Sequence, residues 1–213
     1  MKPTGIQPTR DAEPLAFSPR QGEVLDAALH LLVTKGDSLT MGAVTKAASC
    51  SKETLYNWFG DRDGLLTAII RWQAAKVSMP EVDPGQLDVT GLSNSIEQFG
   101  ASLLGVLTGK TSVALNRVAI GRAGAEGATL GQTMLHFGRF AMGRRLKPLL
   151  EAGRRAGLIS FTDAEEAFAS FFGLLVRDVQ IRLLLGEKSN LSAGQIEQQA
   201  GIATKQFMRI FTI

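Results

Sequence analysis

Four polar residues that suit helix N-caps divide residues 18–76 into short segments, and this punctuation constrains the fold more than any other feature. They are Ser18, Thr40, Ser51 and Asp61. Apolar residues recur at helical spacing after these caps. Pro19 occupies a first helical position and Gly36 lies just past a helix end, as helices prefer. The sequence predicts helices from Pro19 to just before Gly36, over Met41–Ala48, over Lys52–Phe59 and from Arg62 to about Lys76.

The rest of the chain also carries helical spacing, punctuated by glycines. Pro80, Pro84 and Gly85 predict a loop over residues 79–87. The helices predicted after it are Val89–Thr108, Thr111–Gly121, Gly127–Gly157, Thr162–Gly186 and Ser192–Phe211. Strand-like alternation and a repeat of fixed period are both missing, so we expect an all-α fold.

Composition narrows the class of protein. Of 213 residues, 45% are hydrophobic, which supports a sizeable core and argues against disorder. The single cysteine, Cys50, allows no intrachain disulfide and indicates a reducing compartment. The longest apolar run, residues 167–176, is too short to span a bilayer, and the N-terminus lacks the apolar core of a signal peptide. We therefore expect a soluble cytoplasmic protein with no membrane partner.

Residues that would support catalysis are sparse. The sequence has no nucleophile elbow, metal-ligand spacing or paired carboxylates, and its two histidines, His30 and His136, nearly exclude a His/Cys metal site. The glycine-rich run over residues 121–127 follows no strand, so it indicates a flexible connection rather than a nucleotide-binding loop. We expect no enzyme activity, no metal and no cofactor.

Residues 40–59 have the pattern of a helix-turn-helix. Val44, Ala48, Cys50 and Leu55 can meet in one small core between two short helices. The exposed face of the second helix then carries polar side chains of moderate reach, which suit base edges and phosphates. Many helical proteins have short polar helices, so a helical protein-interaction module without sequence-specific DNA binding is the alternative. Alanine at Lys52, Thr54, Tyr56 and Asn57 distinguishes the two, because it abolishes only DNA binding.

The string SKETLYNWFGDRDGLL from Ser51 to Leu66 resembles the fingerprint of the TetR family of bacterial transcriptional regulators. The matching residues are Ser51, Thr54, Leu55, Tyr56, Trp58, Phe59, Arg62, Leu65 and Leu66. The upstream residues Ala27, Ala28, Gly36, Thr40 and Val44 are also similar to those of the family. Thr45 and Ser49 depart from the family's usual Ala and turn Gly, and Cys50 stands where Val or Ile is common.

The resemblance assigns the DNA contacts by position. Phosphate contacts fall on Thr40, Tyr56, Trp58 and Arg62, and base contacts fall on Lys52, Glu53, Thr54 and Asn57. Lys52 can donate to guanine, whereas Glu53 can accept from cytosine and repels phosphate at wrong sites. Trp58 has a second interpretation as a core residue beside Phe59.

Charge is distributed unevenly. Residues 20–76 hold seven basic and six acidic residues, so the DNA-binding candidate is nearly neutral, and we expect a shallow salt dependence of DNA binding. Residues 117–155 hold eight basic and two acidic residues. A solvated face is the ordinary explanation of that excess. Our hypothesis is that part of it faces an anionic ligand such as a carboxylate.

The resemblance also implies a ligand pocket and a dimer interface in the C-terminal part. Apolar pocket candidates are Phe99, Leu103, Leu107, Met134, Phe137, Phe140 and Phe168, and polar ones are Asn116, Arg117, Gln132, His136 and Arg139. An apolar stripe on the last helices predicts dimer contacts. It comprises Phe171, Phe172, Leu175, Val179, Arg182, Ile196, Ala200 and Phe207. The same stripe would also suit the core of one protomer.

These expectations describe an N-terminal three-helix helix-turn-helix DNA-binding domain followed by a larger helical ligand-binding and dimerisation domain. The flexible arm is residues 1–17, the DNA-binding domain residues 18–77 and the larger domain residues 78–213. The implied function is a ligand-responsive transcriptional regulator, with a repressor favoured. Its partners would be a palindromic operator in double-stranded DNA, a second copy of the chain and an unknown small-molecule effector. The helix that begins after Asp61 is the expected lever between pocket and DNA.

Overall fold

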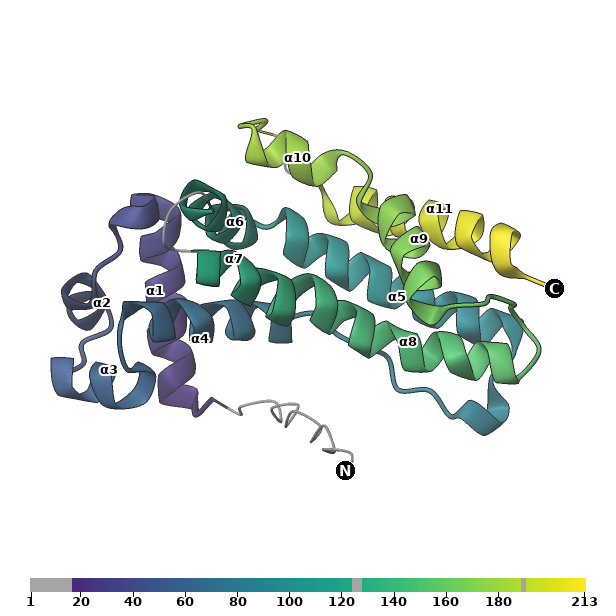
Figure 1. Ribbon diagram of the computed structural model, residues 1–213, viewed down its shortest axis with the longest axis horizontal. Helices are drawn as coiled ribbons and strands as arrows, with labels where there is room; N and C mark the ends of the chain where they lie inside the picture. Colours follow the sequence, from purple (N-terminus) through teal and green to yellow (C-terminus); the bar gives the residue numbers. More distant parts are fainter. Residues whose placement is uncertain (1–16, 124–127, 189–190) are drawn as a thin grey trace, which may run out of the picture.

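The computed structural model describes residues 17–123, 128–188 and 191–213, and helices dominate all three ranges (Figure 1). Within these ranges the extended pairing is one isolated bridge between Ile159 and Thr212. Figure 1 shows an elongated molecule with helices α1–α3 at one end and the C-terminus at the other. The all-α prediction is confirmed. The predicted arm falls, except for Phe17, outside the described residues.

Helices α1 to α4 begin at the caps expected from the sequence. They span Pro19–Lys35, Met41–Ala47, Lys52–Phe59 and Arg62–Ala75. The side-chain oxygens of Ser18, Thr40, Ser51 and Asp61 each accept a hydrogen bond from the backbone N–H three residues later. Ser18 and Gln21 form a reciprocal capping box. Four orphan N–H groups are thus satisfied locally, which explains why these boundaries could be predicted.

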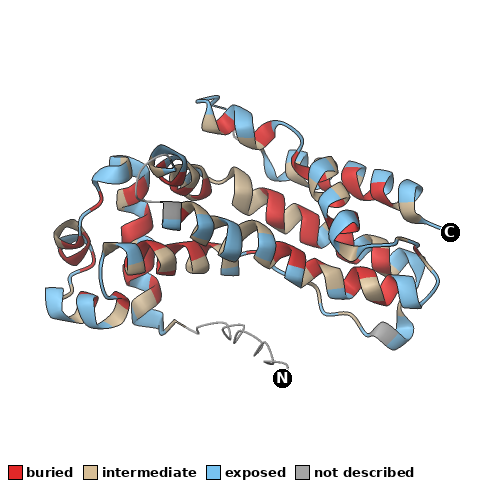
Figure 2. Cartoon of the chain, viewed as in Figure 1, coloured by how far each residue is buried: buried red, intermediate tan, exposed pale blue. Residues whose placement is uncertain are grey.

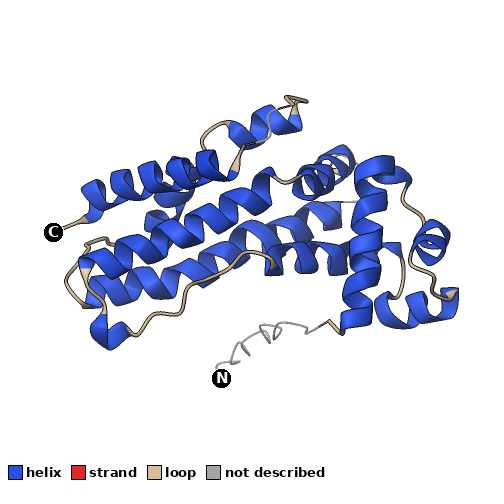
Figure 3. Cartoon of the chain, turned by 180° about the vertical axis from the view of Figure 1, so that it is seen from behind, coloured by secondary structure: helices blue, strands red, loops and turns tan. Residues whose placement is uncertain are grey.

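The remaining helices form the second part of the molecule. They are α5 (Val89–Thr108), α6 (Lys110–Arg122), α7 (Ala128–Met134), α8 (Phe140–Arg155), α9 (Ala164–Val176), α10 (Val179–Leu184) and α11 (Ala193–Phe211). Figure 3 shows the connection from α4 to α5 running along the outside of the bundle. It includes the short 3-10 turn Pro84–Gln86 inside the predicted loop. Buried residues lie on the helix faces that meet in the middle of the bundle (Figure 2).

Two predicted helices are interrupted. The segment predicted as one helix over Thr162–Gly186 is α9 followed by α10, because Arg177 ends α9 in the left-handed region with φ of 48°. The segment predicted over Gly127–Gly157 contains a π-helical stretch, Leu135–Arg139, between α7 and α8. Such π-helical stretches are rare and occur frequently at functional sites.

The N-terminal helices do not close their core by themselves. Val44, Ala48 and Leu55 are buried together and Cys50 packs against them, as predicted for the helix-turn-helix. The same cluster also contains four side chains of the following helices. They are Leu115, Val118, Ala119 and Leu130, from α6 and α7. A domain boundary between residues 77 and 78 would therefore separate side chains that pack in one hydrophobic cluster.

The turn of the helix-turn-helix holds a strained serine. Ser49 has a φ of 49°, a region that costs a residue with a Cβ roughly 1 kcal/mol. We expect Ser49→Gly to raise the free energy of unfolding by about 0.5 kcal/mol, since relief of strain outweighs the entropy of glycine. Ser51→Ala, two residues away, should instead lower it by about 1 kcal/mol through loss of the α3 cap. Urea unfolding measures both, and a destabilising Ser49→Gly contradicts the strained turn.

Candidate functional site

The exposed face of α3 presents the side chains expected to read DNA. Lys52, Glu53 and Asn57 are exposed, and Tyr56 is 50% exposed. Thr54 is half-buried, and its hydroxyl oxygen lies 2.8 Å from that of Ser51. Leu55 and Phe59 point into the core, so α3 is anchored on one side and polar on the other. An α-helix of this kind at the end of the molecule can enter a major groove (Figure 1).

Arg20 on α1 holds the turn that orients α3. Its Nη2 donates to the carbonyl oxygens of Ala48 at 2.7 Å and Ser49 at 3.2 Å. Ala48 is the C-cap of α2, and the last carbonyls of a helix have no partner within it. Sequence reasoning missed Arg20, because no local pattern indicates a contact across 28 residues. Thr45, which departs from the family pattern, is buried and donates to the carbonyl of Gly42 at 3.0 Å.

The other residues expected to contact DNA differ in the number of contacts that their side chains make within the protein. Thr40 is exposed, and its oxygen caps α2, which leaves its O–H able to donate. Trp58 is half-buried and packs edge-to-face on Phe59 with 6.1 Å between ring centroids. Arg62 is engaged more fully. Its Nε donates to Leu39 O at 2.7 Å, and its Nη2 donates to the backbone oxygen of Asp37 at 2.6 Å.

A network of charges joins the reading head, which comprises α1 to α3 and the loops between them, to α6. Asp37 accepts from Arg62 at 2.8 Å and from Arg122, near the end of α6, at 2.7 Å. Arg122 also lies 3.4 Å from Asp63, in the first turn of α4. Arg122 is only 20% exposed, so water screens these pairs less than it screens fully exposed ones. The network fixes the loop before α2 and the start of α4 to a helix of the second part of the chain.

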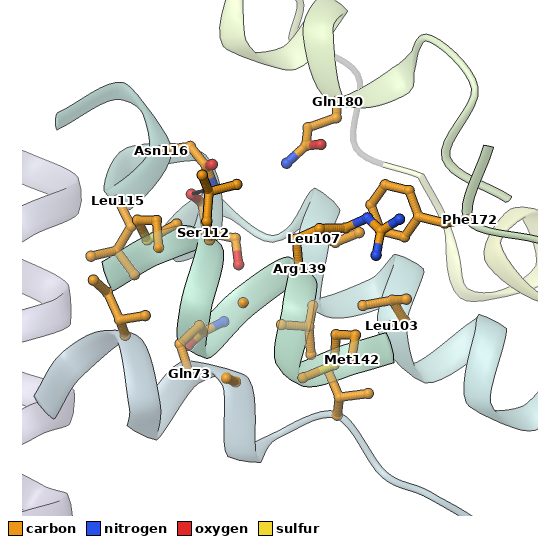
Figure 4. A pocket seen from close by; sticks show the side chains of 17 residues that line it. Gln73, Leu103, Leu107, Ser112, Leu115, Asn116, Arg139, Met142, Phe172 and Gln180 are labelled. Atoms are coloured by element: carbon orange, nitrogen blue, oxygen red, sulfur yellow. Dashed lines mark hydrogen bonds between the residues drawn. The ribbon is translucent and has the colours of Figure 1, made fainter. Parts of the chain in front are cut away.

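A cavity of about 280 Å³ lies among the helices between the reading head and the C-terminus. Eleven of its seventeen lining residues are apolar, and α4 to α10 all contribute to the wall. Figure 4 shows the polar side chains around it, with Gln73 on α4, Ser112 and Asn116 on α6, Arg139 beside Phe172, and Gln180 pointing in from α10. A mostly apolar cavity with a few converging polar groups suits a small organic molecule.

The structure brings some of the predicted pocket residues together. Leu103, Leu107, Asn116, Met134 and Arg139 line the cavity. Phe99 and Phe168 lie in the buried core instead, with no exposed surface. His136, Phe137, Phe140, Arg117 and Gln132 lie outside the lining. Leu135, Gly138 and Arg139, all from the π-helical stretch, line the cavity at the i, i+3 and i+4 spacing of one helix face.

Sequence reasoning missed the contribution of α4 and three polar residues. Ile70, Gln73, Ala74 and Val77 form one wall, although helical spacing alone assigns such residues to a core. The missed polar residues are Gln73, Ser112 and Gln180. No spacing in the sequence indicates that these three helices face a common cavity.

Most of the basic residues in 117–155 serve other contacts. Arg117 donates to the carbonyls of Leu183 and Leu184 at the end of α10. Arg145 donates to Ala74 O and Val77 O at the end of α4, and burial lowers its pKa. Arg154 pairs with Glu151 and Lys147 pairs with Glu165. Of the eight, Arg139 alone is among the residues that line the cavity.

The predicted dimer stripe lies mostly inside one protomer. Phe171, Leu175, Ala200 and Phe207 have no exposed surface, and Phe171 packs edge-to-face on Phe207. Val179 is buried too, and Ile196 packs against the same cluster. Phe172 lines the cavity, and Arg182 is exposed and hydrogen-bonded to Glu187, which raises the pKa of Arg182. The fully buried members belong to the protomer core, the alternative that the periodicity left open.

The described residues lack two further features, a membrane-spanning helix and a cluster of metal-binding side chains. No described helix is long and apolar enough to cross a membrane. Within the same residues, no cluster of three or more His, Cys, Asp or Glu side chains could hold a metal ion.

Sequence comparisons agree with the geometry. A model described as "Bacterial regulatory proteins, tetR family" matches residues 24–69, which cover most of the helix-turn-helix part. A second, "AefR-like transcriptional repressor, C-terminal domain", matches residues 94–212, more than half of the chain. A comparison with curated proteins gave no match.

Solved structures extend the similarity over nearly the whole chain. A TetR transcriptional regulator from Agrobacterium tumefaciens is 46% identical, with a TM-score of 0.79, and the match covers 92% of this chain and 96% of that one. The Flavonoid-responsive Regulator FrrA is 27% identical over 91% and 97% of the two chains, with a TM-score of 0.66. A putative regulator from Mesorhizobium loti, 21% identical over 91% and 97%, shares the fold with a TM-score of 0.73.

The fold and its exposed α3 define a helix-turn-helix DNA-binding protein. The chain belongs to the TetR family of bacterial transcriptional regulators.

Proposed function

We propose that this regulator is a repressor that binds a palindromic operator as a homodimer and is released when a small molecule occupies the cavity. The observation that carries the proposal is the position of α4. Its first turn borders the reading head, and its residues Ile70, Gln73 and Ala74 line the cavity. Ile70 lies eight residues after Arg62, a rise of only about 12 Å along the helix. A ligand that displaces this wall displaces α4 beside the DNA-reading helix.

Helix α6 provides a second connection between cavity and reading head. Ser112, Leu115 and Asn116 line the cavity, and Arg122 near the other end of the helix pairs with Asp37 and Asp63. A ligand that binds more tightly to a conformer whose reading heads are wrongly spaced for the operator shifts the protein toward that conformer. The operator affinity then falls by an amount that the ligand's difference in affinity for the two conformers sets. FrrA is by its name a flavonoid-responsive regulator, which supports a small-molecule effector for this chain.

A dimer supplies the two reading heads that a palindrome needs. The outer faces of α9 and α11 suit its interface. Ala169 and Gly173 are small and exposed on α9, and small residues let a neighbouring helix pack closely. Ile202 and Ile210 are 38% and 62% exposed on α11. We propose that a second copy of the chain covers these faces, in place of the buried stripe predicted from the sequence.

Selection of DNA from a random pool with the purified protein tests the function. We expect one enriched palindrome whose half-site centres lie about one helical turn, or a whole multiple of it, apart. A pool without enrichment after several rounds contradicts sequence-specific DNA binding. An enriched asymmetric single site contradicts the dimer.

Removal of the link between α6 and the reading head should weaken operator binding. We expect Arg122→Ala to lower operator affinity about 5- to 10-fold, because the heads then sample more orientations although Arg122 itself lies outside the reading face. Fluorescence anisotropy with a labelled operator measures the change. Arg154→Ala is the matched control, since it removes an ion pair within α8. Equal affinities of both variants and the wild type contradict the link.

Salt dependence should be shallow. Arg20 and Arg62 are engaged within the protein, which leaves Lys46 and Lys52 as exposed cations on α2 and α3. Two such contacts in each of two protomers predict a slope of log affinity against log salt near −4. Titration of the operator complex between 50 and 300 mM salt measures it. A slope of about −8 or steeper means many further phosphate contacts and contradicts this account.

A further inference from the structure

Two of the residues that line the cavity each carry a buried polar atom without a hydrogen-bond partner in the protein. They are Oε1 of Gln73 and Nη1 of Arg139, each with almost no contact with solvent. The described residues have one more buried polar atom of this kind, Thr204 Oγ1, which does not line the cavity. An unpartnered buried polar atom costs free energy, so two of them in one cavity indicate a ligand that supplies both partners.

Arg139 offers a cation that is only partly neutralised. Its guanidinium lies over the rings of Phe168 and Phe172, at 4.3 and 4.6 Å from their centroids. Its nearest carboxylate, Glu165, is 3.7 Å from Nη1, which is beyond hydrogen-bond length. Glu165 binds Lys147 more closely, at 2.9 Å. Burial lowers the pKa of Arg139, and the charge of Glu165 offsets this effect only in part.

The ring contacts also hold the guanidinium in place. Phe168 is fully buried, and a Cβ on Gly143 would lie 2.8 Å from its ring, so this ring has no room to move toward α8. Phe172 is part of the cavity wall (Figure 4). The ring contacts therefore restrict the guanidinium, which reduces the entropy that it loses when it binds an anionic group.

Gln73 offers an acceptor on the wall formed by α4. The residue is 7% exposed, and Figure 4 shows it on a different side of the cavity from Arg139. Apolar side chains fill the remaining wall, including Leu103, Leu107 and Met142. A hydroxyl group can donate to Gln73 Oε1, whereas a carboxylate at that position has no proton to offer.

We propose that the effector is a compact amphipathic acid, with a carboxylate for Arg139, an apolar body and a hydroxyl for Gln73. This inference rests on the proposed function, in which the cavity is the effector site. The cavity volume of about 280 Å³ is that of about nine water molecules in the liquid, which suits one or two rings rather than a long lipid chain. A ligand hydroxyl bound to Gln73 contacts α4 directly. The hydroxyl would therefore both contribute to recognition and displace α4.

Calorimetric titration of the full-length protein with matched probes tests the proposal. We use three skeletons, naphthalene, biphenyl and phenylpropyl, each as hydroxy acid, acid without hydroxyl, hydroxy amide and hydroxy amine. We expect the hydroxy acid of at least one skeleton to bind about 10-fold or more tighter than its amide, and about 3-fold or more tighter than the acid without hydroxyl. Absence of binding by every acid overturns the proposal, as does equal or tighter binding of the amides or amines.

Variants assign each preference to its residue. Arg139→Gln should remove the preference for acid over amide, and Arg139→Lys, which keeps the charge, should retain part of it. Gln73→Met should remove the preference for the hydroxyl while the unsubstituted acid still binds. Arg154→Gln is the control, because Arg154 pairs with Glu151 within α8 and lies outside the cavity lining, and it should leave every ratio unchanged. Preferences that survive in Arg139→Gln and Gln73→Met overturn the assignment.

The result also separates this inference from the function on which it rests. Acid binding with these preferences, in a protein that selects no DNA site, would refute the regulator function and leave the ligand assignment standing. A selected operator, together with a cavity that shows no preference for acids, would overturn the ligand assignment alone.

Discussion

Asn57→Ala is expected to lower affinity for the selected operator about 30-fold or more and to relax specificity at one base pair of each half-site. Asn57 is exposed on α3, and its amide can pair with an adenine edge. Such a contact contributes about 1–3 kcal/mol and occurs twice in a dimer, which gives a loss of about 2–6 kcal/mol. Anisotropy with the operator and with variants of each base pair measures both effects.

Tyr56→Phe is the contrasting variant. Tyr56 is 50% exposed on the same helix and its hydroxyl is expected to contact phosphate, so its loss should weaken binding to all sequences by the same factor. Glu53→Gln should raise affinity for unrelated DNA, because the carboxylate no longer repels phosphate. If Asn57→Ala weakened the operator and unrelated DNA equally, α3 would not be the element that reads bases.

Phe171→Ala is expected to lower the free energy of unfolding by about 3–5 kcal/mol, a large part of the stability of an ordinary domain. Phe171 is fully buried, and its Cζ lies 3.0 Å from the position that a Cβ on Gly100 would occupy. That close packing leaves little freedom for neighbours to fill the space left by the ring. Urea unfolding followed by circular dichroism measures the loss.

Gly173→Arg, two residues along α9, is the matched control and should have the opposite profile. Gly173 is exposed and a side chain there meets nothing within 4 Å in the protomer. We expect the helix content to be retained and the dimer to dissociate, as seen by sedimentation velocity. If the Phe171→Ala protein stayed stable but became monomeric, Phe171 would be a dimer contact and not a core residue.

The elements that could be predicted from the sequence depend on local chemistry. The four N-terminal caps satisfy N–H groups three residues away, so the residues that form each helix start are neighbours in the chain. The exposed face of α3 follows in the same way from the spacing of Leu55 and Phe59. The family fingerprint adds which of those polar side chains are expected to contact DNA.

The features that could not be predicted depend on contacts distant in sequence or on rare backbone states. Arg177 ends α9 with a positive φ, a conformation that glycine usually adopts. Because the residue is not glycine, the sequence gives no indication of the helix end. Arg62 has the sequence position of a phosphate contact, yet its guanidinium binds Leu39 and Asp37 across more than twenty residues. The stripe around Phe171 has a period that a core and an interface share, and burial within one protomer distinguishes them.

The charge excess in residues 117–155 shows the same limit. The excess of basic over acidic residues in this segment predicts a basic surface or an anion-binding site. Most of these basic residues instead make contacts within the protein. Arg117 and Arg145 bind carbonyls at helix ends, where a cation also interacts favourably with the helix dipole. Only the structure distinguishes these arginines from Arg139, which faces the cavity.

Hydroxyl-radical footprinting on the selected operator tests the central claim most directly, namely that α3 of each protomer in a dimer reads the DNA. We predict two protected patches on one face of the duplex, about one helical turn apart, that disappear together in Asn57→Ala and in Lys52→Ala. Protection that is uniform along the DNA, or a footprint unchanged by both substitutions, would contradict it.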